Sequence, residues 1–306
     1  MALRDIKRRI RSVKNTAQIT KAMEVVSATK MRKSQALALA GRPYAIAAMD
    51  ILKNVSERSP IRPSLLEARE VKTTLLVVIT SDRGLAGAFN ANVLRMADRW
   101  RNEHRAELSR IVTVGKKAAR YFASQKIELV QSFSDYGDYA TRRETEPLAN
   151  LLIQGFLNHE WDRVIVFYTN FRTTLRQEAR SIEVLPIHIE QIRETIRGIK
   201  PEHGRFADLT NGSDELHYSY EYAFEPSPVA VLDRLIPTLF KIQMHHIVLE
   251  SNASEHSARM VAMKNASENA NELIGELTIS YNKARQADIT RELTEITAGK
   301  EAIDQS

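Results

Sequence analysis

Two long segments without helix-breaking residues stand at the two ends of this 306-residue chain. No Pro or Gly occurs from Met1 to Ala40, and from Thr238 to Ala298 there is no Pro and one Gly, Gly275. Helices of globular proteins typically have ~8–20 residues, and a pattern beyond ~25 is typical of a coiled coil or a membrane span. Neither segment is apolar enough for a span. As helices with a rise of ~1.5 Å per residue, the two segments would be roughly 60 Å and 90 Å long. These lengths favour a shaft over an enzyme with a pocket.

The first segment carries an apolar stripe with alternating spacings of three and four residues, which is typical of a left-handed coiled coil. The stripe consists of Leu3, Ile6, Ile10, Val13, Ala17 and Thr20. It then slips to a second frame, Ile19, Met23, Val26 and Lys30, which predicts a stutter that locally unwinds the coil. A bend is expected near residues 41–43, because Pro43 interrupts the pattern.

The last segment mirrors the first. Ser227 is expected to cap a helix that begins at Pro228, with a kink at Pro237. An alanine-rich stripe contains Ile247, Ala258, Val261, Ala262, Ala266 and Ala270. Heptad spacing resumes at Ile274, Leu277, Tyr281 and Ala284, and a shifted frame follows at Ile289, Leu293, Ile296 and Ile303. Because each stripe needs a partner, we expect the two to pair in antiparallel register.

Residues between these segments alternate in pattern, which predicts an α/β domain with a Rossmann-like, mostly parallel sheet. Residues 71–80 form a nearly continuous β-branched and apolar run, as in a strand buried on both faces. Further strands are expected at 111–114, 127–130, 164–168 and 181–189, and helices at 91–100, 116–125 and 147–157. The expected domains are an N-terminal coiled-coil helix at 1–58, the α/β domain at 70–225 and a C-terminal coiled-coil helix at 227–303. Residues 201–219 carry the weakest pattern.

Positive charge is concentrated at the start of the chain. Residues 1–35 hold ten Lys and Arg against two acidic residues, a net charge of +8, whereas the whole chain carries +6. Such a helix can face nucleic acid, anionic lipid or an acidic protein surface, or it can simply be solvated. The first of these, a coiled-coil protein that binds nucleic acid, is weakened because no aromatic residue occurs between Met1 and Arg42.

Catalytic and metal-binding patterns are weak. The loop at 81–90 follows the first strand, where a doubly wound fold places phosphates, but it has neither GxGxxG nor the P-loop lysine. Gly84 and Gly87 are expected to supply turn geometry and close packing, and a nucleotide-binding enzyme remains an alternative. The chain has no Cys, its eight His form no ligand motif, and no GxSxG occurs, so neither cofactor nor metal is expected. No signal peptide is visible, which predicts a cytoplasmic-side protein.

Four segments resemble the gamma subunit of F-type ATP synthases. They are ITKAMEVVSATKMRK at 19–33, SDRGLAGAFN at 81–90, SARMVAMKNA at 257–266 and YNKARQADITRELTEI at 281–296. The resemblance runs from the first helix to the last with the order of parts intact. Many relatives carry Cys where Ala86 stands, a position where any small residue is expected to serve. Relatives often carry a small residue where Asp288 stands, which weakens the expected close packing at that turn of the coil.

This resemblance implies a central rotor that couples ion transport to ATP synthesis and has no active site of its own. The implied partners are three alpha and three beta subunits, an epsilon subunit and the c-ring, with attachment to the cell membrane through them. Beta-subunit contacts are implied for Met23, Lys30, Arg32, Lys33, Arg83, Glu255, Arg259, Gln286, Thr290 and Glu292, with Arg8 and Arg9 on the same basic surface. The coupling ion, H⁺ or Na⁺, is not implied.

Overall fold

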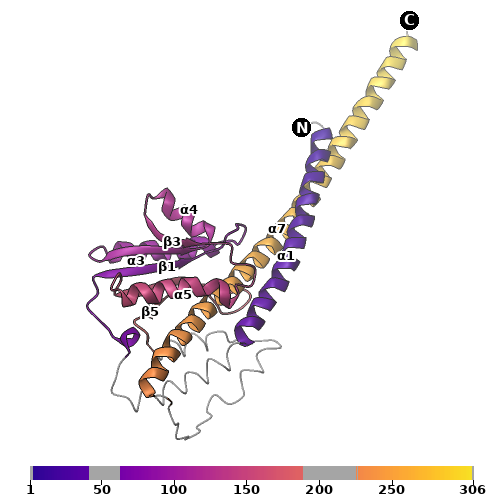
Figure 1. The fold of residues 1–306 in the computed structure, drawn as a ribbon. Helices are drawn as coiled ribbons and strands as arrows, with labels where there is room; N and C mark the ends of the chain where they lie inside the picture. Colours follow the sequence, from indigo (N-terminus) through magenta and orange to yellow (C-terminus); the bar gives the residue numbers. More distant parts are fainter. Residues whose placement is uncertain (1–2, 41–62, 189–224, 226, 305–306) are drawn as a thin grey trace. The chain divides into compact units, whose positions relative to one another are not determined.

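A computed structural model describes residues 3–40, 63–188, 225 and 227–304. The elements are α1 (Leu3–Ala40), the 3₁₀ helix η1 (Ser64–Leu66), β1 (Thr73–Ile79), α3 (Phe89–Glu103), β2 (Leu108–Val114), α4 (Lys116–Ser124), β3 (Leu129–Phe133), α5 (Arg142–Leu157), β4 (Arg163–Phe171), β5 (Gln177–Leu185) and α7 (Pro228–Asp304) (Figure 1). The expected bend at 41–43 and the weakly patterned residues 201–219 lie outside the described residues.

The chain divides into two units. A coil unit contains residues 1–26 and 260–306, and an α/β unit contains residues 27–259. The helices α1 and α7 each contribute to both units. The domain ranges expected from the sequence, 1–58, 70–225 and 227–303, stay predictions.

In the coil unit, α1 and α7 lie antiparallel, and heptad positions face each other. Ile6, Ala17 and Thr20 of the expected stripe are buried, and Leu3, Ile10 and Val13 are half-buried. On α7 the inward positions recur at spacings of three and four: Met263, Ser267, Ala270, Ile274, Leu277, Tyr281, Ala284 and Asp288. The hydroxyl of Ser267 donates to the backbone carbonyl of Ala17 at 3.4 Å. The antiparallel pairing of the two helices is therefore confirmed. The predicted alanine-rich stripe is partly wrong, because Met263 and Ser267 are buried whereas Val261, Ala262 and Ala266 are only half-buried.

The expected stutter is wrong. Buried positions on α1 continue in the first frame through Thr20, Ser27, Met31, Ser34 and Ala38, whereas Ile19 and Val26 are more than half exposed. The prediction failed because small hydroxyl residues recur every seven residues along the seam, the inward-facing stripe of α1, while large apolar residues face outward.

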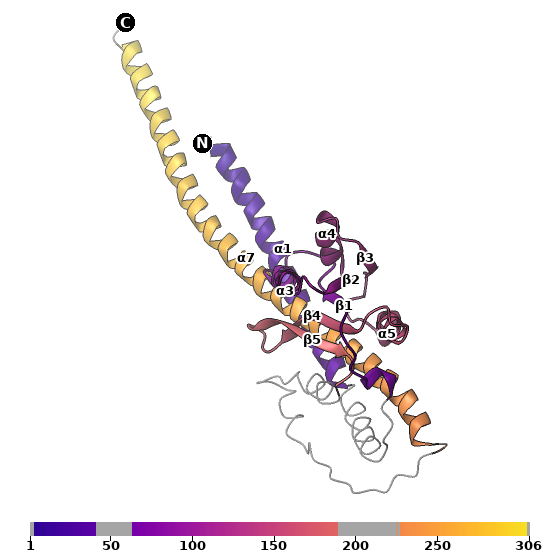
Figure 2. The same cartoon turned by 90° about the vertical axis from the view of Figure 1, so that its left-hand side faces the viewer.

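Among the residues that the structure describes in the coil unit, no helix lies beside the last part of α7. Figures 1 and 2 show α7 running on past the N-terminal end of α1. All described side chains from Ile289 to Ala298 are exposed, including those of Leu293 and Ile296. The expected shifted frame therefore has no partner within the described residues, and the side chain of Ile303 is not among them.

The α/β unit is built on a five-stranded sheet in the order β3-β2-β1-β4-β5. Three neighbouring pairs are parallel, and β5 runs antiparallel to β4. The fold class is confirmed. Sequence boundaries were less accurate: β5 begins four residues before the expected position 181, and α5 begins at Arg142 rather than 147. A capping box explains the earlier start of α5, because Thr141 and Glu144 bond each other's backbone N–H groups.

Helices cover both faces of the sheet. On one face, Leu76 and Val78 of β1 pack against α3 and α4 through residues such as Val93 and Phe122. On the other face, α5 and the first half of α7 enclose a larger core containing Trp161 and Phe240. Ser227 caps α7 as expected, since its hydroxyl accepts from the N–H of Ala230 at 3.3 Å, and α7 continues through Pro237 without a break. Among the described helices, none has the combined length and apolar content that a membrane crossing needs.

Candidate partner-binding surfaces

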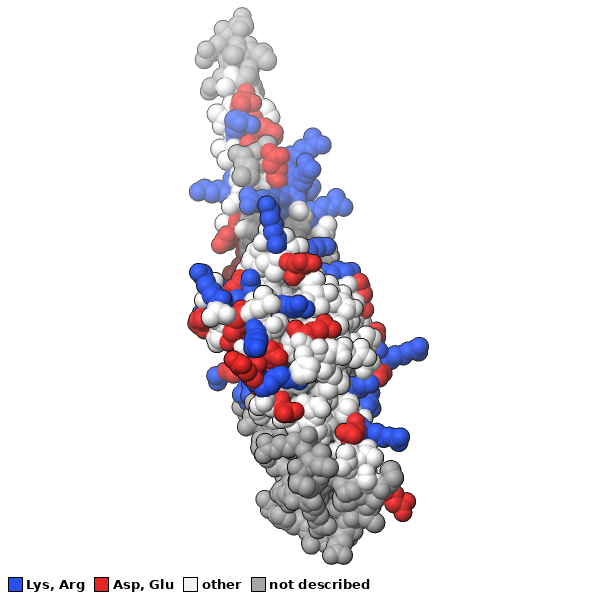
Figure 3. Space-filling view, turned by 60° about the vertical axis from the view of Figure 1, so that its left-hand side comes forward, with Lys and Arg blue, Asp and Glu red and all other residues white. Residues whose placement is uncertain are grey.

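The coil unit exposes the basic side chains of its first helix. Arg4, Arg8, Arg9 and Arg11 lie on the outside of α1, opposite the seam. Within the part of the chain that the structure describes, none of these four forms an ion pair with an acidic side chain. Blue Lys and Arg side chains gather along the upper, helical part of the face shown in Figure 3. This charge is therefore available to another molecule.

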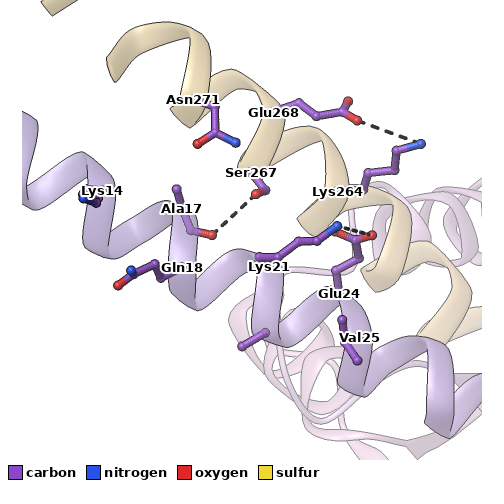
Figure 4. A pocket seen from close by; sticks show the side chains of 11 residues that line it. Lys14, Ala17, Gln18, Lys21, Glu24, Val25, Lys264, Ser267, Glu268 and Asn271 are labelled. Carbon is purple, nitrogen blue, oxygen red and sulfur yellow. Dashed lines mark hydrogen bonds and ion pairs between the residues drawn. The ribbon is translucent and has the colours of Figure 1, made fainter. Parts of the chain in front are cut away.

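A groove of about 570 Å³ runs between α1 and α7 in the coil unit. Eight of its eleven lining residues are polar or charged, but their carbon stems leave more apolar than polar surface in the groove: Lys14, Ala17, Gln18, Lys21, Ala22, Glu24, Val25, Lys264, Ser267, Glu268 and Asn271. Figure 4 shows the bond between Ser267 and Ala17, together with the Lys21–Glu24 pair on α1 and the Lys264–Glu268 pair on α7. An open groove of this kind suits a protein surface better than a small molecule, because ligand pockets enclose most of a ligand's surface.

Four of the candidate contact residues lie in the coil unit. Met23 is half-buried, and Gln286, Thr290 and Glu292 are exposed on α7. The hydroxyl of Thr290 donates to the carbonyl of Gln286 at 2.9 Å. Because this bond uses the backbone carbonyl of Gln286, it leaves the side-chain amide of Gln286 exposed and able to bind a partner.

Three more lie on α1 in the α/β unit. Lys30 forms an ion pair of 2.7 Å with Asp138, and the ammonium of Lys33 lies 4.2 Å from the centre of the Tyr139 ring. Burial disfavours the ionised form of Asp138, but the hydrogen bond and charge of Lys30 outweigh it and hold the pKa of Asp138 below its usual value. Arg32 is exposed. The loop after β3 therefore engages two of the three cations, which sequence patterns did not indicate.

The remaining three meet at the loop after β1. Arg83 is exposed, but the side chains of Glu255 and Arg259 keep only 15% and 10% of their surface accessible. They form an ion pair of 2.7 Å, one helical turn apart on α7. Burial raises the pKa of Glu255, and the charge of Arg259 partly offsets this effect. This pair is an internal feature of the α/β unit rather than an exposed surface.

The expected phosphate position is occupied by internal bonds. The carboxylate of Asp82 accepts from the N–H groups of Lys116 and Asp135 at 2.9 and 3.0 Å, and Asn90 accepts from the N–H of Ser81 at 2.9 Å. A cavity of about 30 Å³ beside Asp82 has room for about one water molecule. These contacts favour a structural loop over a nucleotide site.

The glycine interpretation was half right. Gly87 has a φ of 56° and supplies the expected turn. Gly84 has ordinary space around it, because an added Cβ would meet its nearest atom, Nζ of Lys117, at 3.7 Å. The close approach occurs instead at Gly115, where a Cβ would lie 2.1 Å from the carbonyl oxygen of Thr80. The position of Gly115 between a strand and a helix is the sequence feature that could have indicated this close approach.

Histidines do not form a metal site among the described residues, where no group of three His, Asp or Glu side chains comes together. Burial lowers the pKa of His256 to about 4, and its Nε2 lies 3.2 Å from the carbonyl oxygen of Asp138. The neutral ring donates to that oxygen through Nε2 and so holds the loop after β3.

Comparison with known proteins places the whole chain in one family. The family model described as ATP synthase matches residues 2–303. The ATP synthase gamma chain of Roseiflexus castenholzii is 41% identical, with 98% of each chain covered. That of Chlorobaculum tepidum is 37% identical, with 99% of each chain covered.

Solved structures agree in fold. A chain of the Euglena gracilis mitochondrial ATP synthase (OSCP/F1/c-ring, rotational state 3) has a TM-score of 0.63 at 20% identity, with 98% of this chain and 94% of that chain covered. A chain from the central stalk and c-ring of the Tetrahymena thermophila mitochondrial ATP synthase has a TM-score of 0.57 at 25% identity, with 81% and 99% covered. On the full-length matches, this chain belongs to the family of ATP synthase gamma chains.

Proposed function

We propose that this chain is the central rotor shaft of a membrane ATP synthase and transmits torque between ion flow through a c-ring and the catalytic beta subunits. The coil unit carries the proposal. It joins both ends of the chain in one antiparallel pair and still leaves Ile19, Val25 and Val26 more than half exposed. Exposed apolar side chains on neighbouring turns of one helix favour a contact with another protein. The relatives named gamma chain support this role.

Asymmetry of the coil explains how such a shaft drives a ring of partners. One side of the pair is lined by the basic α1, whereas α7 carries Gln286, Thr290 and Glu292. Turning the pair presents these faces to the surrounding beta subunits in succession. Each face binds one conformation of a beta subunit better than another, and this difference in affinity shifts the conformation.

The proposed partners are three alpha and three beta subunits around the coil, with an epsilon subunit and the c-ring at the α/β unit. Structures of relatives named rotor and central stalk with c-ring support this assembly. Attachment to the cytoplasmic side of the cell membrane then occurs through partners. The chain itself performs no catalysis, which agrees with the internal bonds of Asp82 at the only phosphate-like loop that the sequence indicated.

Contacts with beta subunits are proposed for the exposed members of the candidate set in each unit. In the α/β unit they are Arg32, Lys33 and Arg83, and in the coil unit they are Gln286, Thr290 and Glu292, together with the half-buried Met23. Lys30 takes part through a side chain already held by Asp138. Exposed ion pairs are individually worth ~0–1 kcal/mol, so this surface acts through several weak contacts together.

Purification of the native complex tests the assembly. Mass spectrometry is expected to find this chain with alpha, beta, epsilon and c subunits, and calorimetry of the isolated chain is expected to find no stoichiometric ATP binding. A chain that purifies alone, or that binds ATP at micromolar concentration, would contradict the proposal.

Met23→Lys tests the contact itself. The new cation is expected to form a charge-assisted bond of ~1.5–3 kcal/mol with an acidic group of a beta subunit and to hold one rotary position too firmly. ATP hydrolysis should persist while ATP-driven ion pumping in reconstituted vesicles falls. A proportional loss of both, with poor assembly, would mean that Met23 only packs in the coil.

A further inference from the structure

One arginine of α7 binds the backbone of the loop after β1. Nε and Nη2 of Arg259 donate to the carbonyl oxygen of Gly84 at 3.4 and 3.2 Å, and Nη2 lies 3.5 Å from the carbonyl oxygen of Arg83. The same Nη2 bonds Glu255 at 2.7 Å. A planar guanidinium suits this task, because its N–H groups form a rigid fork that reaches several acceptors at once.

Other contacts anchor the loop on its remaining sides. The hydroxyl of Ser81 donates to the carbonyl of Arg83 at 2.6 Å, and the carboxylate of Asp82 accepts two backbone N–H groups. Leu85 has a φ of 65°, which a leucine seldom adopts, and the residue is 64% exposed. The loop therefore has a fixed backbone that directs a cation, Arg83, and an apolar side chain, Leu85, toward solvent.

We propose that Arg259, neutralised by Glu255, is a positioning residue that holds this loop so that Arg83 and Leu85 meet a partner subunit as one preformed contact. The matching surface on the partner is an acidic side chain beside an apolar one. A loop ordered before binding loses little conformational freedom on binding, which strengthens the contact. This inference rests on the proposed function, since it takes the partner to be a subunit of the same complex.

The proposal replaces direct contact as the role of Glu255 and Arg259. An ion pair buried within the α/β unit is poorly accessible to a moving partner. The three bonds from Arg259 to loop carbonyls, in contrast, hold the loop backbone directly. The two roles respond differently to Arg259→Lys. Lysine keeps the charge but loses the fork, so a clamp fails while a simple charge contact survives.

Electron paramagnetic resonance on the full chain tests the clamp. The chain has no Cys, so Leu85→Cys provides one site for a nitroxide label. We expect an immobile label in the parent and a mobile one after Arg259→Lys, with a cooperative thermal transition that shows the variant is still folded. Arg234→Lys is the matched control, because Arg234 is an exposed arginine on the same helix within the α/β unit, and it should leave the label immobile. This experiment needs no partner, so its result stands apart from the fate of the proposed function.

The consequence is tested in the reconstituted complex, with unlabelled chains that keep Leu85. Arg259→Lys is expected to lower the number of ions pumped per ATP several-fold, and Arg234→Lys to leave it unchanged. An immobile label in the lysine variant would overturn the clamp, whether or not coupling changes. A mobile label with normal coupling would overturn the link between loop position and partner contact.

Discussion

The coil unit and the α/β unit bury their side chains in opposite ways. In the α/β unit, Trp161, Phe156 and Phe240 are completely enclosed between the sheet, α5 and α7. In the coil unit, the seam consists largely of small or half-buried residues such as Ala17, Ser267 and Ala284, and Ile279 and Ile296 remain exposed. The α/β unit therefore has the interior of a self-sufficient domain, whereas the coil unit has the surface of a part that other chains surround.

Removing the largest side chain of the α/β core tests this contrast most strongly. Trp161 is fully buried, packs against Gly155 and donates to the carbonyl of Leu152 at 3.1 Å. Trp161→Ala is expected to lower the free energy of unfolding by ~3–5 kcal/mol, because it leaves a cavity. Leu277→Ala in the coil seam is the comparison and should cost less than ~1.5 kcal/mol, because Leu277 is only half-buried. Equal losses in urea unfolding of the isolated chain would contradict the contrast.

A buried carboxyl group makes the stability of the α/β unit depend on pH. Burial raises the pKa of Glu250 to about 8, although the N–H of Phe171 and the charges of Arg180 and Arg172 oppose the rise. The folded chain therefore keeps a proton that the unfolded chain releases above pH ~4.5. Stability attributable to this group is complete below that pH and is lost as the pH rises toward 8.

Glu250→Gln should remove this pH dependence. The amide stays neutral, so the variant is expected to gain a few kcal/mol over the parent at pH 8 relative to pH 5. Urea midpoints at both pH values measure the difference. Glu268→Gln, on an exposed residue of the coil unit, is the control and should follow the parent. Parallel curves for Glu250→Gln and the parent would mean that the carboxyl group is solvated.

Two threonines sharpen the contrast on a smaller scale. Thr141 caps α5 through the N–H of Glu144, whereas Thr278 donates to the carbonyl of Ile274 on the exposed side of α7. Thr141→Ala is expected to cost about 1 kcal/mol because a backbone donor loses its acceptor. Thr278→Ala should change stability by less than ~0.5 kcal/mol, because that carbonyl already accepts within the helix. Thermal unfolding of both variants checks this, and a larger loss for Thr278 would reverse the expectation.

Sequence periodicity predicted the fold well in segments where the burial of apolar side chains alone determines the pattern. The run at 71–80 identified β1 because a strand buried on both faces needs apolar residues throughout. The heptad stripes identified the antiparallel coil. The frame beyond Thr20 was missed because Ser27 and Ser34 occupy seam positions while Ile19 and Val26 face outward. In a shaft that partners surround, outward apolar residues contact the partner subunits, and these contacts are absent from the structure of one chain.

The candidate site was predicted in part. Resemblance indicated Glu255, Arg259 and Arg83, and the structure brings these three together at one loop. The resemblance gave no indication that Glu255 and Arg259 lie inside the α/β unit. The exposure of these two side chains depends on loops that are distant from them in sequence. The roles of Asp138 and Tyr139 in holding Lys30 and Lys33 were missed for the same reason.

Rotation of this chain inside its complex is the most direct test of the shaft proposal. Ala123→Cys places a single thiol on the exposed end of α4 in the α/β unit, for a bead or fluorophore in a chain that otherwise has no Cys. With the alpha and beta subunits fixed to a surface, we expect the label to turn in one direction in steps during ATP hydrolysis. Hydrolysis at the normal rate with a stationary label would contradict the account.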